Sequence, residues 1–193
     1  MKRKLLMILS GVFLLSASGY SQIQKGNVLA GGDIANFNIG LKSGSAFQMT
    51  IDPKLAFFIQ DNLAVGAYLN FGLATVAHST STSYGVGGLA RYYFSDKTNM
   101  IPLRHSRFFV EGNIGINGQN VSGGSSTNGL GLGIGPGYAY FITPNIGLET
   151  LLKYNGIVGF GNAVTQSNLN LNVGFQIYLP SRKLRSKLEN DTR

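Results

Sequence analysis

The chain has 193 residues, of which 27 are glycine, 12% are charged and none is cysteine, so disulfide bonds and thiolate metal sites are excluded. Its net charge of +8 includes three basic residues in the first four positions and a net +3 from residues 180–193, which hold five basic and two acidic side chains. The remaining +2 is too small to predict a nucleic-acid partner.

The first 21 residues are typical of a cleavable signal peptide. The basic start MKRK precedes the apolar run Leu5–Leu15, and the small-residue stretch SASGYS follows it. That run has eleven residues, well short of the roughly 20 that a membrane-spanning helix needs. We therefore expect residues 1–21 to be an export signal that is removed near Ser21 and Gln22.

After residue 22, short segments alternate between apolar residues and polar or small ones, and this period of two is typical of β-strands. In the first segment Asp33 falls on the apolar face with Phe37 and Ile39, unless a β-bulge shifts the register. The last segment, NLNLNVGFQIYL, alternates most regularly. The eight segments lie near residues 26–39, 47–59, 63–73, 84–94, 107–116, 128–141, 146–154 and 168–179.

The sixth segment has a glycine at every second position from Gly129 to Gly137. A phosphate-binding turn would need clustered glycines before a helix, but here the alternation continues without one. All these glycines therefore lie on one face of a strand. Two explanations stay open: the glycines leave room inside a barrel, or they relieve crowding against large residues on neighbouring strands.

The residue types on the two faces of each segment predict which face meets lipid. One face is almost entirely leucine, isoleucine, valine and phenylalanine, whereas the other is mostly glycine and asparagine with a few charges. A soluble, lipocalin-like barrel would need a solvated outer face, and this polar face is too sparse in charge for that. Apolar-out and polar-in is the arrangement of a membrane barrel, whose sheet closes so that every backbone group is paired. We predict an all-β fold, an eight-stranded antiparallel up-and-down transmembrane β-barrel.

The export signal, the eight amphipathic strands and the final strand ending in GFQIYL resemble the small outer-membrane β-barrels, the transmembrane domain of the outer-membrane protein A type. The resemblance covers about residues 26–179 and rests on pattern. It implies a bacterial outer-membrane location, contact with membrane lipid and lipopolysaccharide, and insertion by the barrel-assembly machinery. We assign residues 22–179 to the barrel and residues 180–193 to a basic periplasmic tail.

An even number of strands places both termini of the barrel on the periplasmic side, so its connections alternate between outer loops and inner turns. The inner connections are QDN, TPN and the longer SDKTNMIPLRHS. Long polar loops outside and short turns inside are typical of such barrels. The outer loops, rich in serine, threonine, glycine and asparagine, are expected near residues 41–45, 78–83, 118–128 and 156–166.

Charged residues on the inward face should pair, because an isolated ion in a narrow lumen costs several kcal/mol. The predicted ion-pair network consists of Asp52, Lys54, Arg91, Glu111, Glu149 and Lys153. Large inward residues near the periplasmic strand ends should close the lumen there, leaving a water-filled cup that is open only to the outside. This predicted plug consists of Phe58, Tyr93, Phe109, Phe141 and Tyr178.

Three functions stay open for such a barrel. A structural, adhesive or surface-interaction role through the outer loops is our main prediction, with no enzymatic activity, cofactor or metal. The alternative is a porin-like conduit or binder of a small solute. The third is a lipid-modifying enzyme, for which His78 would be the base, because His105 lies in an inner connection. We do not expect that activity, since no acidic residue in the outer loops is placed to orient His78.

Overall fold

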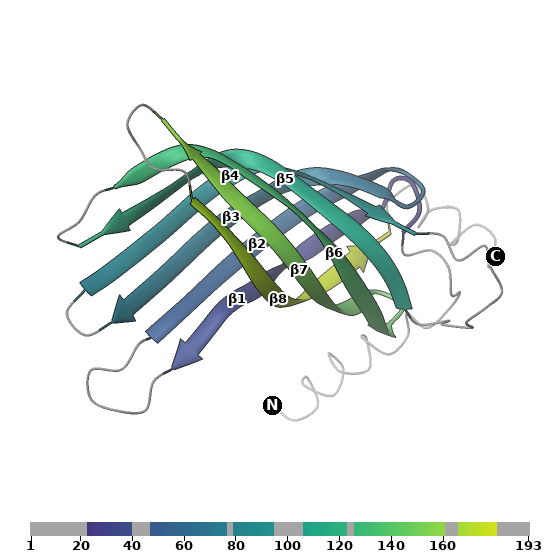
Figure 1. The fold of residues 1–193 in the computed structure, drawn as a ribbon. Helices are drawn as coiled ribbons and strands as arrows, with labels where there is room; N and C mark the ends of the chain where they lie inside the picture. Colours follow the sequence, from purple (N-terminus) through teal and green to yellow (C-terminus); the bar gives the residue numbers. More distant parts are fainter. Residues whose placement is uncertain are drawn as a thin grey trace, which may run out of the picture.

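The computed structural model describes residues 23–39, 47–76, 79–94, 106–122, 126–160 and 166–180. These residues confirm the predicted all-β fold, since eight antiparallel strands close in sequence order into one barrel (Figure 1). The strands are β1 (Val28–Ile39), β2 (Phe47–Gln60), β3 (Leu63–Val76), β4 (Ser79–Tyr93), β5 (Ser106–Val121), β6 (Thr127–Thr143), β7 (Ile146–Gly159) and β8 (Gln166–Leu179). The predictions that fall outside the described residues concern the signal peptide 1–21, the first outer loop 41–45, His78, His105 and the tail beyond residue 180.

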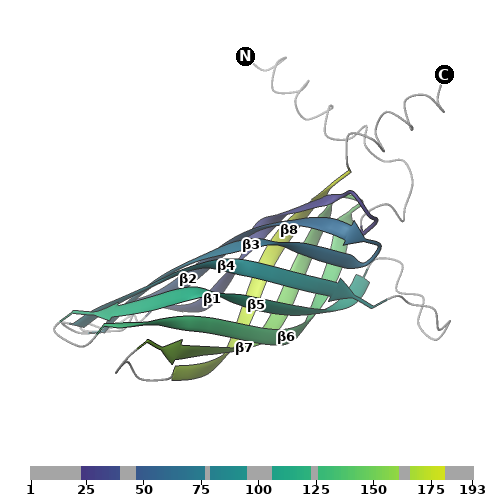
Figure 2. The same ribbon diagram turned by 90° about the horizontal axis from the view of Figure 1, so that it is seen from above.

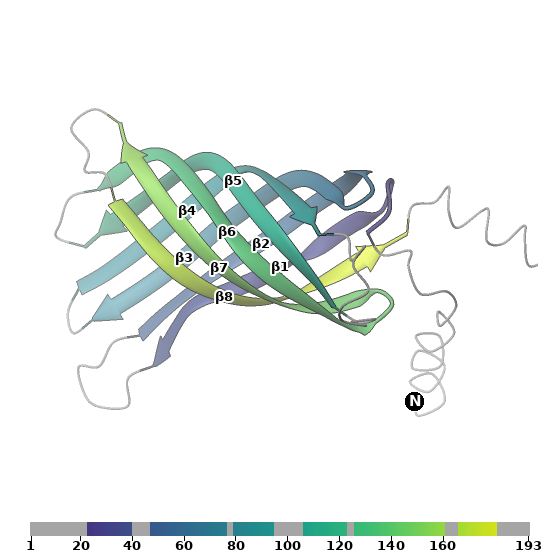
Figure 3. The same ribbon diagram turned by 45° about the vertical axis from the view of Figure 1, so that its right-hand side comes forward.

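The pairing of the first strand with the last closes the barrel. Val28 of β1 pairs with Phe57 of β2 on one side and with Leu179 of β8 on the other. Every strand therefore has a hydrogen-bonded neighbour on both edges, and no edge is left open to lipid. The strands run obliquely around the barrel (Figure 3).

The two ends of the barrel differ in which strand ends they collect. The end of β1 and the start of β2 lie at one end, together with the facing ends of β3 and β4, β5 and β6, and β7 and β8 (Figures 1 and 2). The β2–β3 and β6–β7 turns lie at the opposite end. We call the first the outer end and the second the inner end, following the orientation expected from the sequence.

The outer surface of the barrel is apolar, as predicted. Leu169, Leu171 and Ile134 are 64%, 60% and 61% exposed, and similar side chains cover every strand. A soluble domain rarely exposes so large an apolar area, whereas lipid hydrocarbon is its natural surrounding. Among the described residues, no helix is long and apolar enough to cross a membrane.

A β-bulge accounts for the irregular first segment. The register of β1 with β2 shifts between Ala35 and Asn38. Asn36 has a φ of 52°, in the left-handed region that asparagine tolerates better than most residues. Asp33, which lies before the bulge, points into the lumen and is only 2% exposed. The bulge therefore shifts the alternation of the later residues of β1 relative to Asp33.

The strands extend further toward the outer end than predicted, so three of the predicted loops (78–83, 118–128 and 156–166) are partly wrong. The additional strand residues are 79–83 in β4, 118–121 in β5, 127–128 in β6 and 156–159 in β7. Serine- and threonine-rich composition suggested loops there, but these residues also pair well as strands. Gln119 Nε2, for example, donates a hydrogen bond to Ser81 Oγ across β4 and β5 at 2.9 Å. Polar side chains are therefore compatible with a ladder that continues past the apolar band.

Arginine substitutions at two adjacent positions of β8 test the direction of its faces. Leu171 is 60% exposed on the outer face, whereas Asn170 lines the lumen. Leu171→Arg should lower the free energy of unfolding by roughly 2–4 kcal/mol, because it places a charge in lipid. Asn170→Arg should cost far less. Urea-induced unfolding from lipid vesicles measures both, and equal losses would contradict the outward direction of Leu171.

Candidate functional site in the barrel lumen

The lumen has three layers between its inner and outer ends. An aromatic plug lies nearest the inner end, an ion-pair layer follows it, and a polar cup lies toward the outer end. Most strands contribute to more than one layer, because every second residue points inward. In β4, for example, Tyr93 belongs to the plug, Arg91 to the ion-pair layer and Ser83 to the cup.

The aromatic plug contains the five rings that the sequence placed near the periplasmic strand ends. They come from β2, β4, β5, β6 and β8 and are at most 7% exposed. The ring centroids of Tyr93 and Phe109 are 5.4 Å apart, and those of Phe141 and Tyr178 are 5.1 Å apart. Phe58 packs on Tyr93 at 5.9 Å, and the Tyr93 and Tyr178 hydroxyls share a hydrogen bond of 2.8 Å. The five rings thus form one cluster across the lumen.

Glu111 of β5 is the centre of the ion-pair layer. Its carboxylate lies 2.6 Å from Arg91 Nη2, 3.1 Å from Lys54 Nζ and 3.3 Å from Lys153 Nζ. These cations come from β4, β2 and β7, so the ion pairs cross the lumen as well as joining neighbouring strands. The structure therefore brings three residues of the predicted network to the carboxylate of a fourth.

Arg91 connects the ion-pair layer to the plug. Its Nη1 lies 2.6 Å from Glu149 Oε2, and the Tyr178 hydroxyl donates to Glu149 Oε1 at 2.7 Å. The guanidinium also lies over the Phe109 ring, with Cζ 4.1 Å from the ring centroid, which is a cation–π contact. The two layers consequently form one packed unit.

Asp33 of β1 belongs to this layer, although it is not part of the network predicted from the sequence. Lys54 Nζ lies 2.6 Å from Asp33 Oδ2, and Gln176 Nε2 donates to Asp33 Oδ1 at 3.0 Å. Simple alternation placed Asp33 on the apolar face because the bulge that follows it was only one possibility. Its charge was the signal that could have found it, since ionisable residues inside a membrane span face the protein interior.

Asp52 is the one residue of the predicted network that the structure does not bring into the ion-pair layer. Among the described residues it forms no ion pair; instead Asn70 Nδ2 donates to Asp52 Oδ1 at 2.6 Å. The reason lies in the register, because Asp52 is the direct cross-strand partner of Asp33. Like charges at such positions repel, and Lys54 pairs with Asp33. Asp52 therefore lies on the cup side of the layer.

The ion-pair layer is electrically balanced. All of its charged side chains are buried, so each would cost several kcal/mol without a partner. Ion pairing offsets that cost. The layer is therefore necessary in a narrow lumen, but its net contribution to the stability of the barrel is not large. Its cations are Lys54, Arg91 and Lys153, and its carboxylates are Asp33, Glu111 and Glu149.

The inward glycines of β6 make room for atoms of neighbouring strands. A Cβ on Gly137 would overlap the Phe109 ring, and one on Gly135 would overlap the backbone of Leu152. By contrast, a Cβ on the lipid-facing Gly88 would come no closer than 3.7 Å to its nearest neighbour. Of the two explanations that the sequence left open, the structure thus favours relief of crowding.

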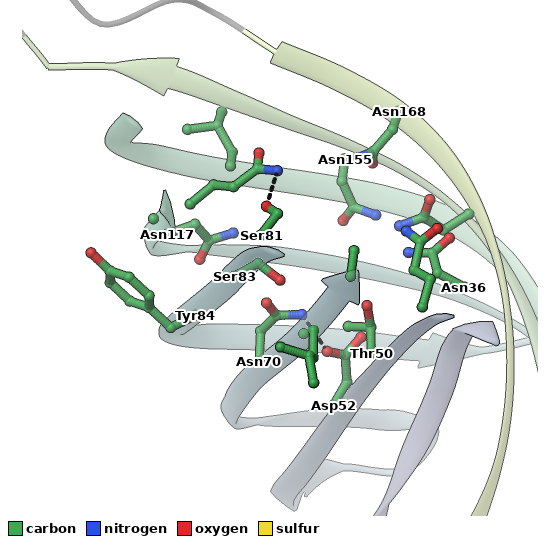
Figure 4. A pocket seen from close by; sticks show the side chains of 18 of the residues that line it. Asn36, Thr50, Asp52, Asn70, Ser81, Ser83, Tyr84, Asn117, Asn155 and Asn168 are labelled. Carbon is green, nitrogen blue, oxygen red and sulfur yellow. Dashed lines mark hydrogen bonds between the residues drawn. The ribbon is translucent and has the colours of Figure 1, made fainter. Parts of the chain in front are cut away.

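The polar cup is a cavity of about 170 Å³ in the outer half of the lumen. Side chains from several strands turn into this space, and hydrogen bonds join Asn70 to Asp52 and Gln119 to Ser81 (Figure 4). Lys153 lines the cavity and also pairs with Glu111, so the ion-pair layer forms the floor of the cup. The asparagines that line the cup are Asn36, Asn70, Asn113, Asn117, Asn155, Asn168 and Asn170.

The arrangement of these groups limits the chemistry of the lumen. Each of its four carboxylates accepts at least one hydrogen bond from an inward side chain. Within the described ranges, no group of three or more His, Cys, Asp or Glu residues is placed to hold a metal ion. The two inner layers fill their part of the lumen, and the cup is lined with hydrogen-bonding groups.

Glu111→Gln tests the role of the central carboxylate, since it removes the charge and keeps the shape. Three buried cations would then share two carboxylates, so the free energy of unfolding should fall by about 3–5 kcal/mol. Unfolding in urea from lipid vesicles measures this loss. Asp61→Asn is the control, because Asp61 is an exposed carboxylate in the β2–β3 turn and should change stability by less than about 0.5 kcal/mol. An unchanged unfolding midpoint for Glu111→Gln would contradict a bracing role.

Comparison with solved structures shows the fold. Neisserial surface protein A is 21% identical over 78% of this chain and 95% of its own, with a TM-score of 0.51. Ail of Yersinia pestis is 12% identical over 79% of this chain and all of its own, with a TM-score of 0.48. The N-terminal β-barrel domain of Pseudomonas aeruginosa OprF is 17% identical over 80% of this chain and 98% of its own, with a TM-score of 0.46.

The likeness to Neisserial surface protein A agrees with the features of the chain itself. No protein-family model matches the chain, and no curated protein matches its sequence. Neisserial surface protein A supports the resemblance to small outer-membrane β-barrels at the level of the fold. The closed sheet and apolar outer surface are what lipid contact in such a membrane requires. The chain has the fold of an eight-stranded barrel of the bacterial outer membrane.

Proposed function

We propose that this protein is a non-enzymatic outer-membrane barrel that does not conduct solutes and that acts through its outer end. The role is structural, adhesive or a surface interaction. The observation that carries this proposal is the filled inner half of the lumen, where the aromatic plug and the ion-pair layer lie in series. Because that half is closed, contact with molecules outside the membrane is left to the outer end.

The closed lumen supports this role over a porin-like conduit. Passage of a solute would require both inner layers to move, and Arg91 joins them through Glu149, Tyr93 and Phe109. Separating these groups would leave buried charges without partners, which is costly in a narrow lumen. A solute that enters from outside therefore stops at the floor of the cup.

The outer strand ends offer a polar surface for such interactions. Beyond the apolar band, exposed residues of β4, β5 and β6 include Thr82, Asn120 and Asn128. Thr82 and Asn120 are direct cross-strand partners, and the Tyr84 hydroxyl donates to Asn128 Oδ1 at 2.6 Å. We place the interaction surface on these extended strands as well as on the loops, because the strands hold its side chains in a fixed geometry.

The engagement of the lumen carboxylates supports a non-enzymatic role. Glu111 and Glu149 are held by Arg91, and Asp33 is held by Lys54, so these groups serve the packing of the barrel.

Lipopolysaccharide beside the outer strand ends and the barrel-assembly machinery at the last strand are further proposed partners. Both follow from the fold resemblance and from the GFQIYL ending of β8.

Conductance in planar lipid bilayers tests the closed lumen. The wild-type barrel should show no steady channel, with a larger porin as the positive control. Phe141→Gly should also stay closed, because it removes one ring of the plug and leaves the ion-pair layer in place. A steady channel in the wild-type barrel would overturn the proposed function in favour of a conduit.

Cysteine labelling tests which end reaches the cell surface. The chain has no cysteine, so each single substitution introduces a unique thiol. A membrane-impermeant maleimide should label Thr82→Cys, at the outer end, on intact cells. It should label Asp61→Cys, in an inner turn, only after the outer membrane is permeabilised. The reverse pattern would mean that the cup opens to the periplasm.

A further inference from the structure

We propose that the polar cup binds a small, uncharged, polyhydroxylated solute such as a monosaccharide. This inference rests on the closed lumen of the proposed function, since the ion-pair layer is the floor of the binding site. It assigns a ligand class to a cavity that a purely structural barrel would not need. The argument depends on the size of the cavity, on its hydrogen-bonding groups and on its charge.

The size of the cup limits its occupant. Its volume of about 170 Å³ is below the roughly 300–1,000 Å³ of pockets that hold drug-sized ligands. Its walls are mainly amides and hydroxyls, with Thr50, Ser81 and Ser83 among the asparagines (Figure 4). An apolar occupant would leave these groups without partners, which is unfavourable. The cup therefore suits a small molecule that carries many polar groups.

Three side chains in the cup have hydrogen-bonding capacity to offer. Asp52 accepts one hydrogen bond among the described residues, at Oδ1, which leaves Oδ2 for a ligand. Asn113 Oδ1 is buried and has no hydrogen-bond partner there. Among the described residues, Lys153 Nζ donates one long hydrogen bond of 3.3 Å, to Glu111, and lies 5.6 Å from the centroid of the Tyr68 ring, although an ammonium group has three protons to donate. These acceptors and this donor thus belong to residues that line the same small space.

Hydroxyl groups match this combination better than other chemistries. A hydroxyl donates one proton and accepts at two lone pairs, so it can donate to Asp52 or Asn113 and accept from Lys153 or an asparagine amide. Hydrogen bonds to a carboxylate or an ammonium are the stronger kind. A ligand with several hydroxyls would therefore satisfy the acceptors and the donor together.

The charge of the lumen selects against anions. The ion-pair layer is balanced, and Asp52 adds one further carboxylate without an ion-pair partner among the described residues. Among the described residues, the ion-pair layer and the cup together therefore have three cations, four carboxylates and one excess negative charge. An anionic sugar would meet that charge in a narrow, weakly solvated space, whereas a neutral sugar would not.

Titration followed by NMR tests this proposal directly. Barrel labelled with ¹⁵N in lipid nanodiscs is titrated with the neutral hexoses glucose, galactose and mannose, and with glucuronate as the anionic counterpart of glucose. At least one neutral hexose should shift the side-chain amide signals of Asn113 and Asn117 saturably, and glucuronate should bind about tenfold more weakly than glucose or not at all. No saturable shift with any hexose, or stronger binding of glucuronate than of glucose, overturns the inference.

Two variants separate binding from folding. Asp52→Asn keeps the acceptor for Asn70 and should weaken hexose binding by about tenfold, because a charge-assisted hydrogen bond is lost. It should also reduce the discrimination against glucuronate. Asn113→Leu removes a buried acceptor without a partner, so it should fold at least as well as wild type and bind hexose more weakly. Unchanged binding in both variants overturns the assignment of the site.

A matched control and a parallel measurement complete the test. Asp61→Asn makes the same change at the exposed inner turn and should leave binding unaltered; weaker binding in this variant would contradict a site in the cup. Conductance of the same preparation separates the two proposals. A non-conducting barrel that binds no hexose overturns this inference alone, whereas a conducting barrel overturns the proposed function.

Discussion

Closure of a narrow sheet is the constraint on which the rest of this structure depends. In lipid, every backbone N–H and C=O must be paired within the protein, and the ladder between β1 and β8 completes that pairing. Eight strands leave an interior only wide enough for side chains. The inward side chains of the inner half must therefore pack closely, and the buried charged side chains must form ion pairs.

The ion-pair layer meets this requirement and also specifies how the strands align. Its six charges come from β1, β2, β4, β5 and β7. A strand that slipped by two residues would keep its apolar face toward lipid, yet it would leave a buried charge such as Glu111 without its partners. The apolar outer face alone cannot prevent such a slip, because lipid contacts are not specific. We therefore assign the layer a role in register, beyond its contribution to closing the lumen.

The outer half of the barrel is under a different constraint. The aromatic plug lies near the inner end, and the strands extend outward with serine, threonine and asparagine on both faces. There the inward amides leave a cavity instead of a packed core. Rigidity and closure thus belong to the inner half, and the groups that can recognise other molecules belong to the outer half.

The sequence by itself determined the strand pattern, the lipid-facing side and the residue types of the inward face. These are local properties, because side chains alternate with a period of two and apolar and polar residues separate along it. Only the tertiary structure decided which inward charges meet. The sequence pattern placed Asp52 in the ion-pair network and Asp33 on the apolar face, yet Asp33 lies in the ion-pair layer and Asp52 in the cup. The physical reason is that contacts across a lumen depend on register, on strand tilt and on the bulge after Ala35, which no single segment encodes.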